Sequence, residues 1–274
     1  IIDLGSLNVT GSIGLTTNGA SGNATIVNAQ EIDFSASTIG GDLNATSSGE
    51  LTDSGTLAVT GAASLNATGN NITLDDASNN FGTVSIVSSN NATLVDTNAL
   101  ILGASIVSGD LTITANGDLT DSGTVAVTGT TSLNVTGNNI TLDDGSNNFS
   151  TVTIQPANNV TLVDTNALVL GASTVGGVLN VTVGGELTDS GTVAVTGNTF
   201  LTAGSNNITL DDGSNAFSTV SIISSNNATL VDTNALILGA STVSGDLTIT
   251  ANGDLTDSGT VAVTGTTSLN VTGN

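Results

Sequence analysis

A 68-residue internal repeat is the feature that most constrains the fold. The motif Leu-Thr-Asp-Ser-Gly begins at Leu51, Leu119, Leu187 and Leu255, and no insertion interrupts the interval. Other motifs, such as Ile-Thr-Leu-Asp-Asp, recur with the same spacing. Self-similarity at a fixed period is typical of solenoids and propellers, in which each unit buries its apolar face against its neighbours. The sequence therefore predicts a repeat architecture.

We expect residues 1–274 to form a single continuous solenoid segment. Its expected parts are a divergent repeat at 1–50, full repeats at 51–118, 119–186 and 187–254, and a partial repeat at 255–274. A solenoid needs polar caps because an open end exposes apolar core and unpaired strand edges, and neither end has such a cap. We therefore expect the segment to belong to a longer array, or its ends to be covered by neighbouring subunits.

The local pattern predicts strands. Apolar residues alternate with polar ones in runs of three to five, and Gly, Asn, Asp and Ser break the runs, whereas no window has helical periodicity. Each repeat divides into three units, as in 111–132, 133–151 and 152–178. Strands this short are stable only when coils stack and pair their backbones. The sequence thus predicts an all-β parallel β-helix (β-solenoid) of about twelve coils, three to each repeat.

Three motifs carry a family resemblance. They are Leu-Thr-Asp-Ser-Gly-Thr-Val-Ala-Val-Thr-Gly from Leu119, Asn-Ile-Thr-Leu-Asp-Asp from Asn139 and Asn-Ala-Leu-Val-Leu-Gly-Ala-Ser from Asn166. Nearly the whole chain resembles the β-strand repeats of filamentous-haemagglutinin-like and autotransporter-like bacterial surface proteins. The resemblance implies a right-handed parallel β-helix, secretion to the cell surface or extracellular space, and a role in adhesion or surface structure. The lack of Lys and Arg departs from many such adhesins and argues against an anionic receptor.

Composition restricts the partners. The chain has no Lys, Arg, His or Cys, and 23 acidic residues give a formal net charge of −23. Nucleic acids and anionic membranes need cationic side chains, so both are excluded as partners. No run reaches the roughly 18 apolar residues of a membrane helix, which argues against membrane insertion. Cations, neutral glycans, a cell-surface receptor and further copies of the chain are the partners that remain.

Acidic residues at the corners of the coils are the candidate metal ligands. They are Asp121, Asp143, Asp144, Asp164, Asp189, Asp211, Asp212 and Asp232. If the coils stack in register, these carboxylates line one edge at about 4.8 Å, and Ca²⁺ prefers such oxygen ligands. The alternative is that each Asp accepts hydrogen bonds from backbone N–H groups of its turn. We expect no other cofactor.

Two further polar patterns recur. Asn pairs at 70–71, 138–139 and 206–207 predict a ladder of stacked, hydrogen-bonded side chains. Thr-x-Thr pairs, such as Thr112 with Thr114, resemble the threonine arrays of ice-binding solenoids, but Ser85 and Asn134 interrupt the array.

The residue types leave little scope for catalysis. Without His, Lys or Cys, only paired carboxylates remain, as in glycosidases. An active site is a local exception to regularity, and the repeat is unbroken over 119–274. We therefore expect a structural or adhesive extracellular filament or stalk without catalytic activity, which self-associates into a fibre or longer array. A carbohydrate-active β-helix enzyme and an ion- or ice-binding solenoid stay open as alternatives.

Overall fold

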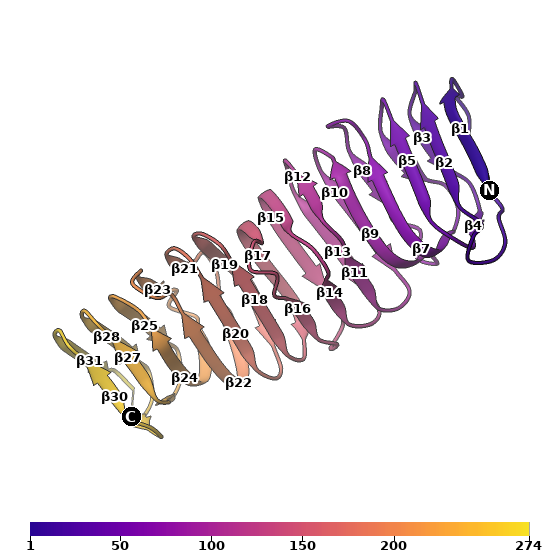
Figure 1. Ribbon diagram of the computed structural model, residues 1–274. Coiled ribbons are helices and arrows are strands. Elements are labelled where there is room, and N and C mark those ends of the chain that lie inside the picture. Colours follow the sequence, from indigo (N-terminus) through magenta and orange to yellow (C-terminus); the bar gives the residue numbers. More distant parts are fainter. Residues whose placement is uncertain (274) are drawn as a thin grey trace. The chain divides into compact units, whose positions relative to one another are not determined.

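The computed structural model describes residues 1–273, in which short strands and turns follow one another without a helix (Figure 1). Its contacts divide the chain into two compact units, Ile1–Thr136 (unit 1) and Gly137–Asn274 (unit 2). Each unit is described by itself.

The strands are three to ten residues long. Those of unit 1 are β1 (Ile2–Leu7), β2 (Ala24–Asn28), β3 (Ile32–Phe34), β4 (Ser37–Ile39), β5 (Leu43–Ser47), β6 (Leu51–Asp53), β7 (Leu57–Asn66), β8 (Ile72–Leu74), β9 (Asn80–Ser88), β10 (Ala92–Asp96), β11 (Leu100–Leu102), β12 (Ser105–Val107), β13 (Leu111–Ala115), β14 (Leu119–Asp121) and β15 (Val125–Asn134). Those of unit 2 are β16 (Ile140–Leu142), β17 (Asn148–Ala157), β18 (Val160–Asp164), β19 (Leu168–Val175), β20 (Leu179–Val183), β21 (Leu187–Asp189), β22 (Val193–Thr202), β23 (Ile208–Leu210), β24 (Ala216–Ser224), β25 (Ala228–Asp232), β26 (Leu236–Leu238), β27 (Ser241–Val243), β28 (Leu247–Ala251), β29 (Leu255–Asp257), β30 (Val261–Val263) and β31 (Thr267–Val271).

Strands of successive turns pair in parallel and form columns. In unit 2, one column runs through Leu168, Leu187, Ile208, Ala228 and Leu247, and the interval between neighbours in this series is the length of one turn. Columns in unit 1 have similar intervals. The predicted all-β parallel β-solenoid is therefore confirmed, and it has about 14 turns, not twelve.

The 68-residue repeat is not a whole number of turns. A column of unit 1 passes from Ala24 through Leu43 and Ala63 to Val84, which is three turns. The equivalent of Ala24 in the next repeat is Ala92, which lies further along the chain than Val84 and stands in the next column. One repeat therefore spans about three and a third turns. Each motif consequently lies one face further round the solenoid than its equivalent in the preceding repeat. This corrects the prediction of three coils per repeat.

Unit 2 has the same offset. The column of Ile140 continues through Val160, Leu179 and Thr199 to Val220. Its equivalent Ile208 stands in a different column, between Leu187 and Ala228. Each column therefore passes through different motifs of the repeat from one turn to the next. No face of the solenoid is reserved for one motif.

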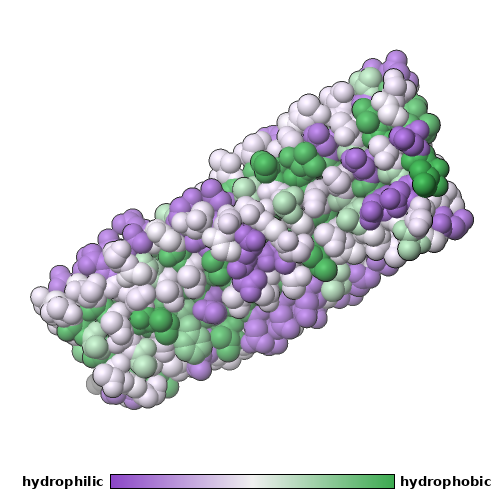
Figure 2. Space-filling view, viewed as in Figure 1, coloured by the Kyte–Doolittle hydropathy of each residue, from purple (hydrophilic) through white to green (hydrophobic). Residues whose placement is uncertain are grey.

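The core follows from the alternation in the strands. In β18 the side chains of Val160, Leu162 and Asp164 are buried, while those between them are partly exposed. Inward Leu, Ile, Val and Ala side chains fill both units, and the largest buried side chains are Phe34, Phe81, Phe149 and Phe217. Burying one such aliphatic or aromatic side chain contributes about 1.5–3 kcal/mol. Outward residues are mostly polar, but some large apolar side chains, such as Ile106 and Ile223, are exposed. Figure 2 accordingly shows scattered apolar patches among polar surface.

Candidate functional site

Acidic corners at the ends of strands are the only concentration of functional groups that the sequence predicted. In unit 2, Asp189 ends β21, Asp211 and Asp212 follow β23, and Asp232 ends β25, so the four residues belong to three successive turns. Asp189 accepts hydrogen bonds from the backbone N–H of Asp211 (3.1 Å) and of Asp212 (3.2 Å). Asp212 in turn accepts one from the backbone of Ser214 (2.8 Å). Asp189 therefore holds the corner of the next turn, and Asp212 stabilises the corner in which it lies.

A buried amide completes this corner, and sequence reasoning missed it. The Asn215 side chain donates to Asp189 Oδ2, and its Oδ1 accepts the backbone N–H of Val193 at 2.7 Å. Asn215 is fully buried, as are its equivalents Asn79 and Asn147. Their recurrence once in each repeat, two positions before the buried Phe, is the signal that could have identified them.

The equivalent corner of unit 1 has the same geometry. Asp53 accepts hydrogen bonds from the backbone of Asp75 (3.1 Å) and Asp76 (3.3 Å) and from the Asn79 side chain. Burial raises the pKa of Asp53, and these three hydrogen bonds oppose the rise. The corner is therefore a repeated structural device.

Two of the predicted ligands point into the core. Asp164 accepts hydrogen bonds from the backbone N–H of Phe149 and, at 2.8 Å, of Asn166. Asp232 accepts one from Asn234 at 3.1 Å. Burial is the main cause that raises the pKa of both carboxyls. Their place inside the solenoid separates them from the exposed Asp211.

The other three predicted ligands lie near the boundary of the units. Asp121 ends β14 in unit 1, and Asp143 and Asp144 follow β16 in unit 2. Asp144 accepts the backbone N–H of Ser146 at 2.9 Å. Asp121 and Asp143 also have interaction partners.

The acidic corner extends over only part of unit 2. Asp189, Asp211, Asp212 and Asp232 stand at this corner in three successive turns, and Asp254 follows in the next turn, after β28. The positions directly above Asp232 are Ala251 and Val271, so the inward carboxyl is not repeated there. The predicted acidic edge is therefore met over these turns and does not run the length of the unit. Within residues 1–273, no three His, Cys, Asp or Glu side chains are grouped so that they could hold a metal ion. Calcium binding stays a prediction.

The predicted asparagine ladder is confirmed over one step between turns, beyond which an aspartate continues it. Asn207 Oδ1 accepts hydrogen bonds from Asn226 Nδ2 (3.1 Å) and from the backbone N–H of Asn227 (3.2 Å). Asn227 Oδ1 then accepts the N–H of Asp246 (2.8 Å), and Asp246 Oδ1 that of Thr266 (2.7 Å). Each turn thus offers a side-chain oxygen to the backbone of the next.

Outward threonines on neighbouring strands of unit 2 form a row along the stacking direction. Thr188, Thr209, Thr229 and Thr248 are neighbours in register, and Ser268 follows them. The adjacent outward row contains different residue types, since Val231 and Thr250 are followed by Asn270.

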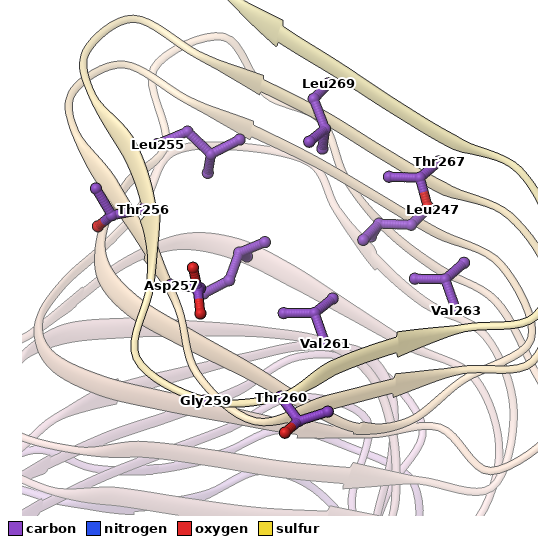
Figure 3. A pocket seen from close by; sticks show the side chains of 11 residues that line it. Leu247, Leu255, Thr256, Asp257, Gly259, Thr260, Val261, Val263, Thr267 and Leu269 are labelled. Carbon is purple, nitrogen blue, oxygen red and sulfur yellow. The ribbon is translucent and has the colours of Figure 1, made fainter.

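A cavity of about 560 Å³ opens in the last turns of unit 2. The side chains of Leu247, Val261 and Leu269 project into it (Figure 3). Leu269 is 55% exposed, whereas its equivalent one repeat earlier, Leu201, is 0% exposed. The cavity is therefore solenoid interior that no further turn covers in this structure.

Comparison with known proteins agrees with the repeat. A family model described as "Repeats of unknown function (DUF5649)" matches residues 21–88, 89–155, 157–224 and 225–274, and the starts of its matches are separated by the same interval as the sequence motifs. No curated protein and no solved structure matches the chain. Among the described residues, no helix is long and apolar enough to cross a membrane. Because the four segments cover almost all of the sequence, the chain belongs to the DUF5649 repeat family.

Proposed function

We propose that the chain is a non-catalytic segment of an extracellular or cell-surface filament or stalk, used for surface structure or adhesion. The observation that carries this proposal is the use of polar side chains at the corners. Asp189, Asn215 and Asn227 hold the backbone of a neighbouring strand or turn. Groups engaged in this way support a scaffold and are poorly placed to act on a substrate.

The resemblance to filamentous-haemagglutinin-like and autotransporter-like repeats supports export and an adhesive role. The parallel solenoid is compatible with that class. A glycan or a surface receptor is the partner that this function implies. The net charge of −23 favours a neutral or cationic partner surface.

Self-association into a fibre is part of the proposal, and a second copy is the proposed partner. Among the described residues, the interior around Leu269 is exposed and no further strand pairs with β29 or β31 beyond β26 and β28, so this turn offers both apolar surface and backbone hydrogen-bonding groups. Such an edge is a template for a further parallel strand. A head-to-tail contact of this kind extends into a filament.

The test is electron microscopy together with sedimentation of the purified chain. We expect filaments whose length increases with protein concentration, and we expect Leu269→Asp to reduce the assembled fraction at least tenfold, because it places a charge in the apolar end. The control is Ile237→Asp, which adds the same charge at an outward position of β26. Monomers at all concentrations, or equal effects of the two variants, would refute the fibre.

Chelation tests the ion-binding alternative. We expect the melting temperature in EDTA to lie within about 2 °C of that in millimolar Ca²⁺, because Asp53 and Asp189 already accept hydrogen bonds on both oxygens. Differential scanning calorimetry measures both values. A rise of ten degrees with Ca²⁺ but not with Mg²⁺ would instead support calcium at the acidic corners.

A further inference from the structure

Three equivalent carboxyl groups point into the solenoid interior. Asp96, Asp164 and Asp232 end β10, β18 and β25, and each is 1–2% exposed. They occupy the same position in successive repeats, so each repeat of this type brings one of them. An isolated carboxylate is costly to bury, and such a group takes up a proton more readily than in water.

The hydrogen bonds of these carboxyls compensate only part of that cost. Asp96 Oδ1 accepts the backbone N–H of Phe81 at 2.8 Å, but Asp96 Oδ2 is buried without a hydrogen-bond partner. Asp232 Oδ2 is in the same situation. In Asp164, both oxygens accept backbone N–H groups.

No cation balances the buried charges. The chain has no Lys, Arg or His. The titratable groups on the strands packed against the three carboxyls are all acidic. Below them, after β8, β16 and β23, are Asp75, Asp76, Asp143, Asp144, Asp211 and Asp212; above them, after β13, β20 and β28, are Asp118, Glu186 and Asp254. Like charges make ionisation of a nearby carboxyl less favourable.

The first repeat shows that the site accepts a neutral side chain. Asn28 stands where the later repeats have Asp96, Asp164 and Asp232, and it is fully buried. Its amide donates to Val9 O (2.9 Å), and its Oδ1 accepts Val9 N–H (2.9 Å). An uncharged polar group of the same shape therefore fits this position in the solenoid.

We propose that these three inward carboxyl groups make the solenoid a pH-sensitive fold, which proton uptake stabilises in mild acid and proton loss destabilises as the pH rises. The proposal is independent of the filament function. Its basis is the burial of the three groups, the unpartnered oxygens of Asp96 and Asp232 and the lack of any Lys, Arg or His side chain. Asp96 is not among the predicted metal ligands, and its burial and unpartnered oxygen carry the proposal by themselves. It assigns a titrating group to each of the three repeats that have Asp at this position, in addition to their scaffold role.

The direction of the effect follows from burial, which raises the pKa of Asp96, Asp164 and Asp232 above the ordinary 3.8. At a pH between the pKa of the unfolded state and the higher pKa of the folded state, the folded state binds more protons than the unfolded state. The stabilisation is complete below pH 3.8 and is lost as the pH rises through the folded pKa. Within that window, each group changes the folding equilibrium constant by up to about tenfold per pH unit.

The experiment compares pH profiles of stability. Urea unfolding from pH 4 to 8 is measured for the wild type and for the triple variant Asp96→Asn, Asp164→Asn and Asp232→Asn. We expect the wild-type midpoint to fall as the pH rises, and the triple variant to lose most of that slope. The control is Asp75→Asn, Asp143→Asn and Asp211→Asn, which removes the same charge from exposed equivalent positions and should keep most of the slope.

Equal slopes for the wild type and the buried-site variant would overturn the proposal, as would an equal loss of slope in the exposed-site control. If the buried-site variant does not fold, the wild type decides the matter by carboxyl NMR with ¹³C-labelled aspartate. Titration of Asp96, Asp164 and Asp232 above the exposed aspartates supports the proposal, and the half-buried Asp53 is expected to titrate above the exposed ones as well. A titration in which none of the three inward aspartates stands above the exposed ones refutes the proposal.

Discussion

Replacing Gly185 with alanine should lower the free energy of unfolding by about 3 kcal/mol, because a methyl group has no space at this corner. A Cβ at Gly185 would lie 2.6 Å from Ala167 N and 2.7 Å from Asn166 C, which are backbone atoms of the turn below. Backbone atoms that belong to a paired column cannot move aside alone. Urea unfolding monitored by circular dichroism measures the loss.

Gly213→Ala is the matched control in the same unit. No atom lies within 4 Å of a Cβ at Gly213, and its backbone is not left-handed. We expect this substitution to change the free energy of unfolding by less than about 0.5 kcal/mol. If both alanine variants were equally stable, turns would not be packed as closely at the Gly185 corner as described.

Replacing Asn215 with alanine should also cost about 3 kcal/mol, because it leaves the buried backbone N–H of Val193 without an acceptor and removes a donor from Asp189. Hydrogen exchange provides a local readout. The amides of Val193 and Asp211 should exchange at least tenfold faster in the variant, since the corner that protects them is lost.

The neighbouring variant Ser214→Ala tests whether the effect belongs to the buried amide. Ser214 is exposed, and its bond to Asp212 uses the backbone N–H, which alanine keeps. Its stability and its exchange at Val193 should match the wild type. Protection of Val193 that survives Asn215→Ala would disprove the role given to this amide.

The parallel solenoid could be predicted because two independent signals agreed. The fixed period required units that stack, and the period-2 alternation in runs such as Val160, Leu162 and Asp164 required strands. The number of residues in a turn had no such signal. A repeat length gives the distance between equivalent motifs, whereas the turn is set by which backbones pair, and Ala24 and Ala92 show that the two differ.

The acidic corners were located correctly along the chain, but their orientation was not predicted. Alternation from Val160 places Asp164 inside, so this part of the answer was present in the sequence. The same rule fails at Asp189. Two residues after the inward Leu187, its side chain should also point inward, but it is partly exposed because β21 ends there and the chain turns. The partner amide Asn215 depends on a contact 26 residues away, which no local pattern contains.

The offset between repeat and turn has a consequence for how such arrays change by recombination. Within a continuous solenoid, the loss or gain of one whole repeat would join identical motifs, so each turn would still meet a matching turn. Every residue beyond the junction would, however, move round by about a third of a turn, as Ala92 does relative to Ala24. Only a change of three repeats, about ten turns, would restore the original direction. Unequal crossing-over in the gene would therefore alter where a surface feature points as well as how far it lies from the start.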